Sequence, residues 1–252
     1  NAIDRTAWSL AKEEPLPEAP HALPRLAPHL LTALKGQGWA GKRIPSTIDR
    51  ARQARMTDLL ARYASVLGAN EVHNAALLVL DVPTGEVLAY VGNLPGADMA
   101  HAGMVDIIQA PRSTGSLLKP FLFADMLQSG ERMPDQLVAD LPTSYDGFAP
   151  RNFDERYDGA VPASQALARS LNVPAVRALH EHGVERTRRM LVAMGLHHLA
   201  RSADDYGLSL VVGGGESTLW ELTGAYASLA RTVLDHRGNE GSDDRSVHPP
   251  WA

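Results

Sequence analysis

A serine and a lysine three residues apart are the first pair in this sequence that could do chemistry together. Ser116 follows the flexible segment Ser113-Thr114-Gly115, and Lys119 precedes the apolar segment 120–124. If a helix begins at Ser116, the two side chains share one face and lie within reach of each other. A lysine that is kept from water loses part of its preference for the charged form, so it can serve as the base that activates a serine hydroxyl.

The use of basic residues favours this interpretation. Lys119 is the only lysine after Lys42, whereas arginines, which cannot give up a proton, are frequent throughout the chain. Unpaired amides at the start of a helix can also stabilise an oxyanion. The alternative is that Ser116 caps the helix and Lys119 is a solvated residue of its first turn. The two residues alone leave both interpretations open.

A second candidate site is Ser170-Leu171-Asn172, between a helix expected over residues 163–169 and another expected to begin at Pro174. Ser170 and Asn172 can point to the same side of such a connection. There a hydroxyl can relay a proton and an amide can hold a substrate carbonyl. Asn172 could instead cap the following helix, for which Pro174 is a suitable first residue. Both roles can coexist.

Other polar groups of the sequence have simpler explanations. Gly213-Gly214-Gly215 is not followed by Gly-Lys-Ser/Thr, so it predicts a turn into a helix, where Thr218 and Glu221 form a capping box, and not a phosphate loop. The two close pairs of histidines, His180 with His182 and His197 with His198, do not have the i, i+4 spacing of a helical zinc pair, so the sequence predicts no metal and no cofactor.

Three acidic residues, Asp154, Glu155 and Asp158, lie close together in a turn-rich segment. Paired carboxylates of this kind could catalyse glycoside hydrolysis. A solvated loop is the expectation here, because acidic residues among turn formers are typical of exposed connections.

The secondary-structure elements that must position these residues are predicted to be strands first and helices afterwards along the chain. Residues 75–81 and 86–92 predict a β-hairpin around the turn Val82-Pro83-Thr84-Gly85. Helices are predicted over 116–128, 163–169, 174–182, 185–194 and 219–234. This order indicates an α+β fold. Upstream, a helix is predicted over 50–67, and prolines at 15, 17, 20, 24 and 28 indicate a connector with one short helix near 7–12.

Composition excludes several classes of protein. The 252 residues suffice for one large or two small domains, and 44% hydrophobic with 21% charged residues is typical of a folded globular chain. A net charge of -5 argues against a nucleic-acid partner. The absence of cysteine excludes disulfides, thiolate zinc sites and cysteine nucleophiles.

Serine with lysine three residues later, followed after some fifty residues by Ser-x-Asn, resembles the motif set of penicillin-binding proteins and serine β-lactamases. Longer segments resemble the transpeptidase domain of class A penicillin-binding proteins, and the segments 44–75 and 208–210 resemble the penicillin-binding protein 1C branch. The matching segments are 44–49, 112–121, 150–154, 166–176, 213–216 and 222–230.

The resemblance implies roles for four residues. Ser116 would be the acylated nucleophile, Lys119 its base, and Ser170 and Asn172 the second motif. It also implies an α+β transpeptidase fold, an antiparallel sheet with a helical subdomain, with the C-terminal part missing because the family's Lys-Thr/Ser-Gly motif is absent from these residues. The expected organisation is a Pro-rich connector (1–43), a linker helix region (44–74) and a transpeptidase domain (75–252).

The implied activity is that of a peptidoglycan D,D-transpeptidase, which cross-links stem peptides and is acylated by β-lactam antibiotics. Its expected partners are those two ligands, together with a glycosyltransferase domain and a membrane anchor in a longer parent chain at the periplasmic face of the inner membrane. Two alternatives remain open. A serine β-lactamase-like hydrolase would activate water to release the acyl group, and a binding or scaffold module would have an incomplete cleft because the third motif is absent.

Overall fold

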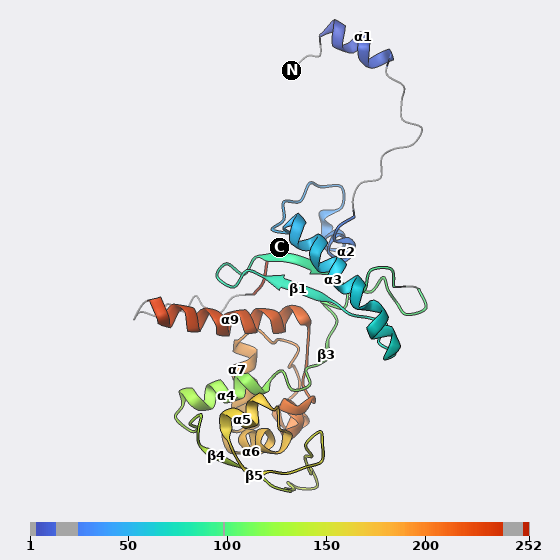
Figure 1. Ribbon diagram of the computed structural model, residues 1–252. Helices are drawn as coiled ribbons and strands as arrows, with labels where there is room; N and C mark the ends of the chain where they lie inside the picture. The colour runs from blue at the N-terminus through green and yellow to red at the C-terminus, as the bar shows by residue number, and fades with distance from the viewer. Residues whose placement is uncertain (1–3, 14–24, 98, 239–248, 252) are drawn as a thin grey trace.

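The computed structural model describes residues 4–13, 25–97, 99–238 and 249–251. Within these residues helices surround three separate two-stranded antiparallel sheets (Figure 1). The elements are α1 (Arg5–Glu13), α2 (Pro28–Leu34), the π-helix η1 (Lys35–Trp39), α3 (Arg50–Ala69), β1 (Leu77–Leu80), β2 (Val87–Val91), β3 (Arg112–Ser113), α4 (Lys119–Gln128), β4 (Leu137–Asp140), β5 (Gly159–Pro162), α5 (Ala163–Ala168), α6 (Asn172–His182), α7 (Val184–Ala193), α8 (Ala203–Tyr206), the 3-10 helix η2 (Gly207–Val212), β6 (Glu216–Ser217) and α9 (Leu219–Gly238).

The predicted hairpin is confirmed as β1 and β2, which pair antiparallel from Leu77 opposite Val91 to Leu80 opposite Val87. The hairpin lies between two helices, with α3 packed on β2 and α9 packed on β1 (Figure 1). Its side chains are apolar on both faces because each face is covered, and this burial supplies the driving force that holds the layer together.

The outer edge of β2 is closed by residues that precede the hairpin in the chain and by Trp251. Gln53 of α3 is 1% exposed, and its side-chain amide accepts from the Tyr90 N–H at 2.7 Å and donates to the Tyr90 carbonyl at 3.0 Å. Thr47 donates to the carbonyl of Val87, whose N–H donates to the carbonyl of Trp251. These partners satisfy backbone groups that an open strand edge would leave unpaired.

The second part of the structure is a helical body, with β4 and β5 at its far side from the hairpin (Figure 1). Its core is built from apolar side chains of α4, α6, α7, η2 and α9, among them Phe121, Leu122, Leu179, Leu210 and Leu222. Within the described residues no helix is both long and apolar enough to span a membrane.

The predicted start of the helix at Ser116 is wrong, because α4 begins at Lys119. Pro120 has no N–H to donate to the Ser116 carbonyl, as an α-helix starting at Ser116 would require. The Lys119 N–H instead donates to that carbonyl at 3.2 Å, three residues back, and the Leu117 N–H donates to Thr114 at 3.0 Å. Residues 115–118 therefore form a tight turn before the helix.

Two further boundaries differ from the prediction. The helix expected from Pro174 begins at Asn172, because the side-chain oxygen of Asn152 accepts the amides of its first two residues. The connector contains α2, which starts at Pro28, since proline is tolerated in a first helical turn. The short helix expected near 7–12 is confirmed as α1, whereas the prolines at 15, 17, 20 and 24 lie outside the described residues.

The double contact of Gln53 with Tyr90 leads to a prediction about stability. Gln53→Ala leaves a buried N–H and a buried carbonyl without partners, so it should lower the free energy of unfolding by about 2–4 kcal/mol. Urea denaturation of the 252-residue chain measures this loss. Arg55→Ala, on the exposed face of the same helix, should change it by less than about 0.5 kcal/mol. Equal losses in the two variants would contradict the assigned role of Gln53.

Candidate active site

The segment before Ser116 is held by the glycine loop 213–215. Strand β3 pairs with β6, Ser113 Oγ donates to the Gly213 carbonyl at 2.8 Å, and the Thr114 N–H donates to the Gly215 carbonyl at 3.0 Å. A Cβ atom on Gly214 would lie 2.0 Å from Ser209 Oγ, so only glycine allows this close approach. The loop is thus a structural support, as the sequence predicts.

Ser116 lies half-buried in the tight turn between β3 and α4. Gly115 enters this turn with a φ of +53°, a conformation that glycine adopts readily. Tyr226 of α9 donates to the Leu117 carbonyl at 2.8 Å and so holds the turn from the opposite side. Within the described part of the chain, neither the hydroxyl nor the amide of Ser116 forms a hydrogen bond. Both groups are therefore available to a ligand.

Lys119, the first residue of α4, is 3% exposed. Its Nζ donates to the Ser170 carbonyl at 2.7 Å, to Ser170 Oγ at 3.1 Å and to Asn172 Oδ1 at 2.7 Å. No carboxylate among the described residues forms an ion pair with it. Burial lowers the pKa of Lys119 from 10.5 to about 8. About a tenth of the molecules therefore carry a neutral Lys119 at pH 7.

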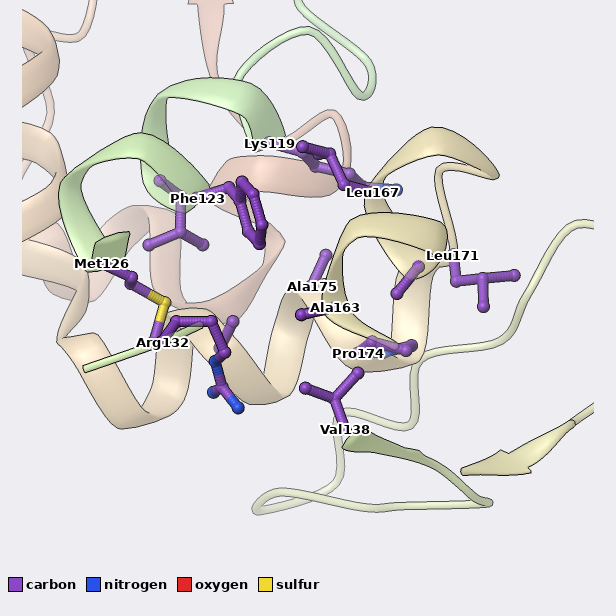
Figure 2. A pocket seen from close by; sticks show the side chains of 13 residues that line it. Lys119, Phe123, Met126, Arg132, Val138, Ala163, Leu167, Leu171, Pro174 and Ala175 are labelled. Atoms are coloured by element: carbon purple, nitrogen blue, oxygen red, sulfur yellow. The ribbon is translucent and has the colours of Figure 1, made fainter. Parts of the chain in front are cut away.

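Lys119 lies beside an apolar pocket, among the side chains that line it (Figure 2). The pocket has a volume of about 50 Å³ and is lined mostly by side chains of α4, α5 and α6, among them Leu122, Leu167 and Pro174, and further by Arg132, Val138 and Leu171. The aliphatic part of Lys119 forms one wall. Water reaches the ammonium poorly in such surroundings, and this desolvation disfavours its charged form.

Ser170 and Asn172 reach Lys119 because the chain turns sharply between α5 and α6. Ser170 adopts a left-handed φ of +55°, which costs about 1 kcal/mol for a residue other than glycine. Asn172 Nδ2 donates to the Arg151 carbonyl at 2.8 Å, which leaves Oδ1 facing Lys119. The side chain of Asn172 does not cap α6, so the capping role considered for it is wrong.

The structure thus joins Lys119, Ser170 and Asn172 directly and places Ser116 in the tight turn that leads into α4 at Lys119. It also brings two residues to the site that the sequence did not single out. Asn152 holds the start of α6, and Tyr226 holds the turn containing Ser116. Both lie in segments that resemble the family, but pattern alone does not show which side chain of a segment makes the contact.

The remaining polar motifs lie away from this site. Thr218 and Glu221 form the predicted capping box at the start of α9. His182 lies buried between Asp125 and Glu131, with ring nitrogens 2.8 Å and 2.7 Å from their carboxylates. Among the described residues, no group of three or more His, Cys, Asp or Glu side chains is arranged so that it could hold a metal ion.

The acidic loop is exposed. Asp158 pairs with Arg169, and Glu155 lies 3.6 Å from Arg151. Asp154 accepts a hydrogen bond from the nearby backbone amide of Arg156. These local partners are those of a solvated loop.

The sequence and the fold match one class of protein. Residues 75–233 match the family described as the penicillin binding protein transpeptidase domain, and the chain therefore belongs to this family. Penicillin-binding protein 1C of Escherichia coli (strain K12) is 33% identical over 221 residues, which cover 88% of this chain and 28% of that protein. Penicillin-binding protein 1F of Bacillus subtilis (strain 168) is 31% identical over 194 residues, which cover 75% of this chain and 26% of that protein. The chain spans about a quarter of these relatives' length.

Solved structures agree with this assignment. Penicillin-binding protein 1A from Haemophilus influenzae has 27% identity and a TM-score of 0.53, over 63% of this chain and 23% of that one. PonA1 from Mycobacterium tuberculosis, solved in complex with penicillin V, has 23% identity and a TM-score of 0.62. The match covers 82% of this chain and 57% of that one. The second likeness shows the shared fold, as expected from the sequence.

The lowered pKa of Lys119 leads to a prediction about stability and pH. Between pH 8 and 10.5 the unfolded chain keeps the proton that the folded chain has released, so the free energy of unfolding gains a contribution that rises with pH. Lys119→Met lacks this contribution. Urea denaturation across this pH range should show wild type gaining stability relative to Lys119→Met.

The exposed lysine variant Lys42→Met serves as the control and should follow wild type. Parallel curves for wild type and Lys119→Met would show that Lys119 titrates as an ordinary lysine in the folded chain.

Proposed function

We propose that this chain carries the acyl-serine chemistry of a peptidoglycan D,D-transpeptidase, which cross-links stem peptides and is acylated by β-lactams. The observation that carries the proposal is the buried Lys119 amine, surrounded by oxygens of Ser170 and Asn172 and located three residues after Ser116. A pKa of about 8 leaves enough neutral amine to act as a base near pH 7.

In the proposed reaction Ser116 Oγ attacks the carbonyl of the penultimate D-alanine of a stem peptide, while its proton passes to Lys119 Nζ. The new Oγ–C bond forms as the C–N bond to the terminal D-alanine breaks, and the departing nitrogen receives the proton. An amine of a neighbouring stem peptide then attacks the ester carbonyl, the C–Oγ bond breaks, and the proton that the amine loses passes through Lys119 Nζ to Ser116 Oγ. The free amide of Ser116 is a suitable donor to the oxyanion formed in each step.

Ser170 is suited to relay the proton. A neutral amine has two hydrogens and one lone pair, so it cannot donate to all three of its present partners at once. The Ser170 carbonyl and Asn172 Oδ1 only accept, whereas the Ser170 hydroxyl can also donate. The Ser170 hydroxyl is therefore the partner that can accept a proton from Lys119 and pass its own on to the departing nitrogen.

The organisation of the chain is part of the proposal. The family match begins at residue 75, which supports a transpeptidase domain over 75–252 preceded by a linker helix region (44–74) and a connector (1–43). The relatives are penicillin-binding proteins, which supports a role in cell-wall synthesis at the periplasmic face of the inner membrane. There the proposed companions are a glycosyltransferase domain and a membrane anchor of the same polypeptide.

Acylation by a labelled penicillin tests the proposal. In the protein at its natural length, intact mass should show one adduct, peptide mapping should place it on Ser116, and Ser116→Ala should abolish it because the variant lacks the proposed nucleophile. Ser129→Ala, at the other end of α4, should keep the adduct.

The lifetime and position of the adduct separate the alternatives. An adduct lost within seconds would favour a β-lactamase-like hydrolase. No adduct would favour a binding or scaffold module, and an adduct that persists in Ser116→Ala would place the nucleophile elsewhere.

Lys119→Arg tests the base directly. Arginine keeps the positive charge and a similar reach but does not give up a proton, so the acylation rate should fall by at least about 100-fold with the fold retained. Stopped-flow acylation measures the rate, and circular dichroism checks the fold. Lys42→Arg should acylate like wild type. A loss of only a few-fold would mean that Lys119 orients Ser116 as a cation and is not its base.

A further inference from the structure

The first turn of α6 needs acceptors that its own sequence does not supply. The first amides of any helix have no partner within the helix, and a polar side chain at the N-cap usually accepts them. The N-cap of α6 is Leu171, which has no polar side chain. Asn172 cannot take over, because its side chain contacts Lys119 and the Arg151 carbonyl.

Asn152, twenty residues earlier in the chain, provides the missing acceptor. Its Oδ1 accepts from the amide of Asn172 at 2.9 Å and from the amide of Val173 at 3.2 Å. The helix that carries Asn172 is therefore capped from a distance. This arrangement frees the Asn172 side chain to reach Lys119.

The Nδ2 group of Asn152 fixes the orientation of its side-chain amide. Nδ2 donates to Asp140 Oδ1 and to the Arg156 carbonyl, each at 2.8 Å, and Asp140 is fully buried at the end of β4. The second carboxylate oxygen of Asp140 accepts from the Asp158 amide at 2.9 Å. A flipped Asn152 would place its NH₂ group against the α6 amides and lose all these contacts. Since Asn152 is 3% exposed, water cannot replace them.

The neighbouring residue completes the support. The Arg151 carbonyl accepts from Asn172 Nδ2 at 2.8 Å, so residues 151 and 152 together hold both the main chain and the side chain of Asn172. We propose that Asn152 is a positioning residue that fixes Asn172 Oδ1 against Lys119. Its contribution to acylation rests on the proposed function, whereas its effect on Lys119 can be measured without it.

The expected effect on the pKa of Lys119 follows from the hydrogen bond that Asn172 Oδ1 accepts from Lys119 Nζ. An acceptor stabilises the ammonium form, so its withdrawal lowers the pKa of a lysine that stays buried. The charged groups beyond Asn152, which are Asp140 and the exposed pair Asp158 and Arg169, remain in place. A variant that merely loosens the fold would admit water and shift the pKa upward.

The experiment follows the ¹³C signals of labelled lysine by NMR in the protein at its natural length, with Lys119 assigned by the loss of its signal in Lys119→Arg. In Asn152→Ala the titration midpoint should fall by about half a pH unit. Asn93→Ala is the matched control, because Asn93 is 2% exposed and bonded through its amide to Asn74, Val105 and Leu94 near the hairpin. It should leave the midpoint unchanged.

A second arm measures penicillin acylation, which should be about 30-fold slower in Asn152→Ala and within about 3-fold of wild type in Asn93→Ala. If wild type is not acylated, the proposed function fails, yet the NMR titration still decides the role of Asn152. If Asn152→Ala does not fold, Asn152→Ser, whose shorter side chain cannot span both sets of partners, should shift the midpoint in the same direction by less.

Two results would overturn the inference. An unchanged midpoint in Asn152→Ala would show that Asn172 keeps its place without Asn152. A midpoint that rises toward the ordinary value would show that Asn152 maintains the burial of Lys119 and not the acceptor at its Nζ.

Discussion

The buried amine of Lys119 is the constraint on which the arrangement of the site depends. An ammonium taken out of water is tolerated only when oxygen atoms replace its hydration in fixed positions. Here those oxygens come from the junction of α5 and α6, some fifty residues away in sequence. The fold must therefore hold this junction against the start of α4, and it accepts the left-handed backbone of Ser170 to do so.

The serine side of the site is held by a different set of supports. The glycine loop fixes the segment before Ser116 through β3 and β6, and Tyr226 of α9 holds the carbonyl of Leu117. Because α9 also packs on β1, one helix connects the hairpin layer to the turn containing Ser116. The position of Ser116 relative to Lys119 thus depends on contacts made in both parts of the structure.

Sequence patterns predicted the hairpin and the longer helices and singled out four candidate site residues, but they predicted neither the short strands β3 to β6 nor the contacts that arrange the site. The hairpin, the long helices and the Thr218 capping box follow from local propensity and turn chemistry, which act over a few residues. The starts of α4 and α6 do not. The start of α4 depends on Pro120, which has no N–H; this is a local property that the sequence itself shows. The start of α6 depends on Asn152, a partner twenty residues away that no local pattern shows.

The closed edge of β2 has a consequence for where this domain can be divided. The family match begins at residue 75, yet Thr47 and Gln53 complete the hydrogen bonding of a strand within that match. A protein cut at residue 75 would present Val87 and Tyr90 as an open template to which other chains could add, and it would tend to self-associate through that strand. The edge of β2 is covered only when Thr47 and α3 are present, so the helix before the residues that match the family packs as part of the same layer.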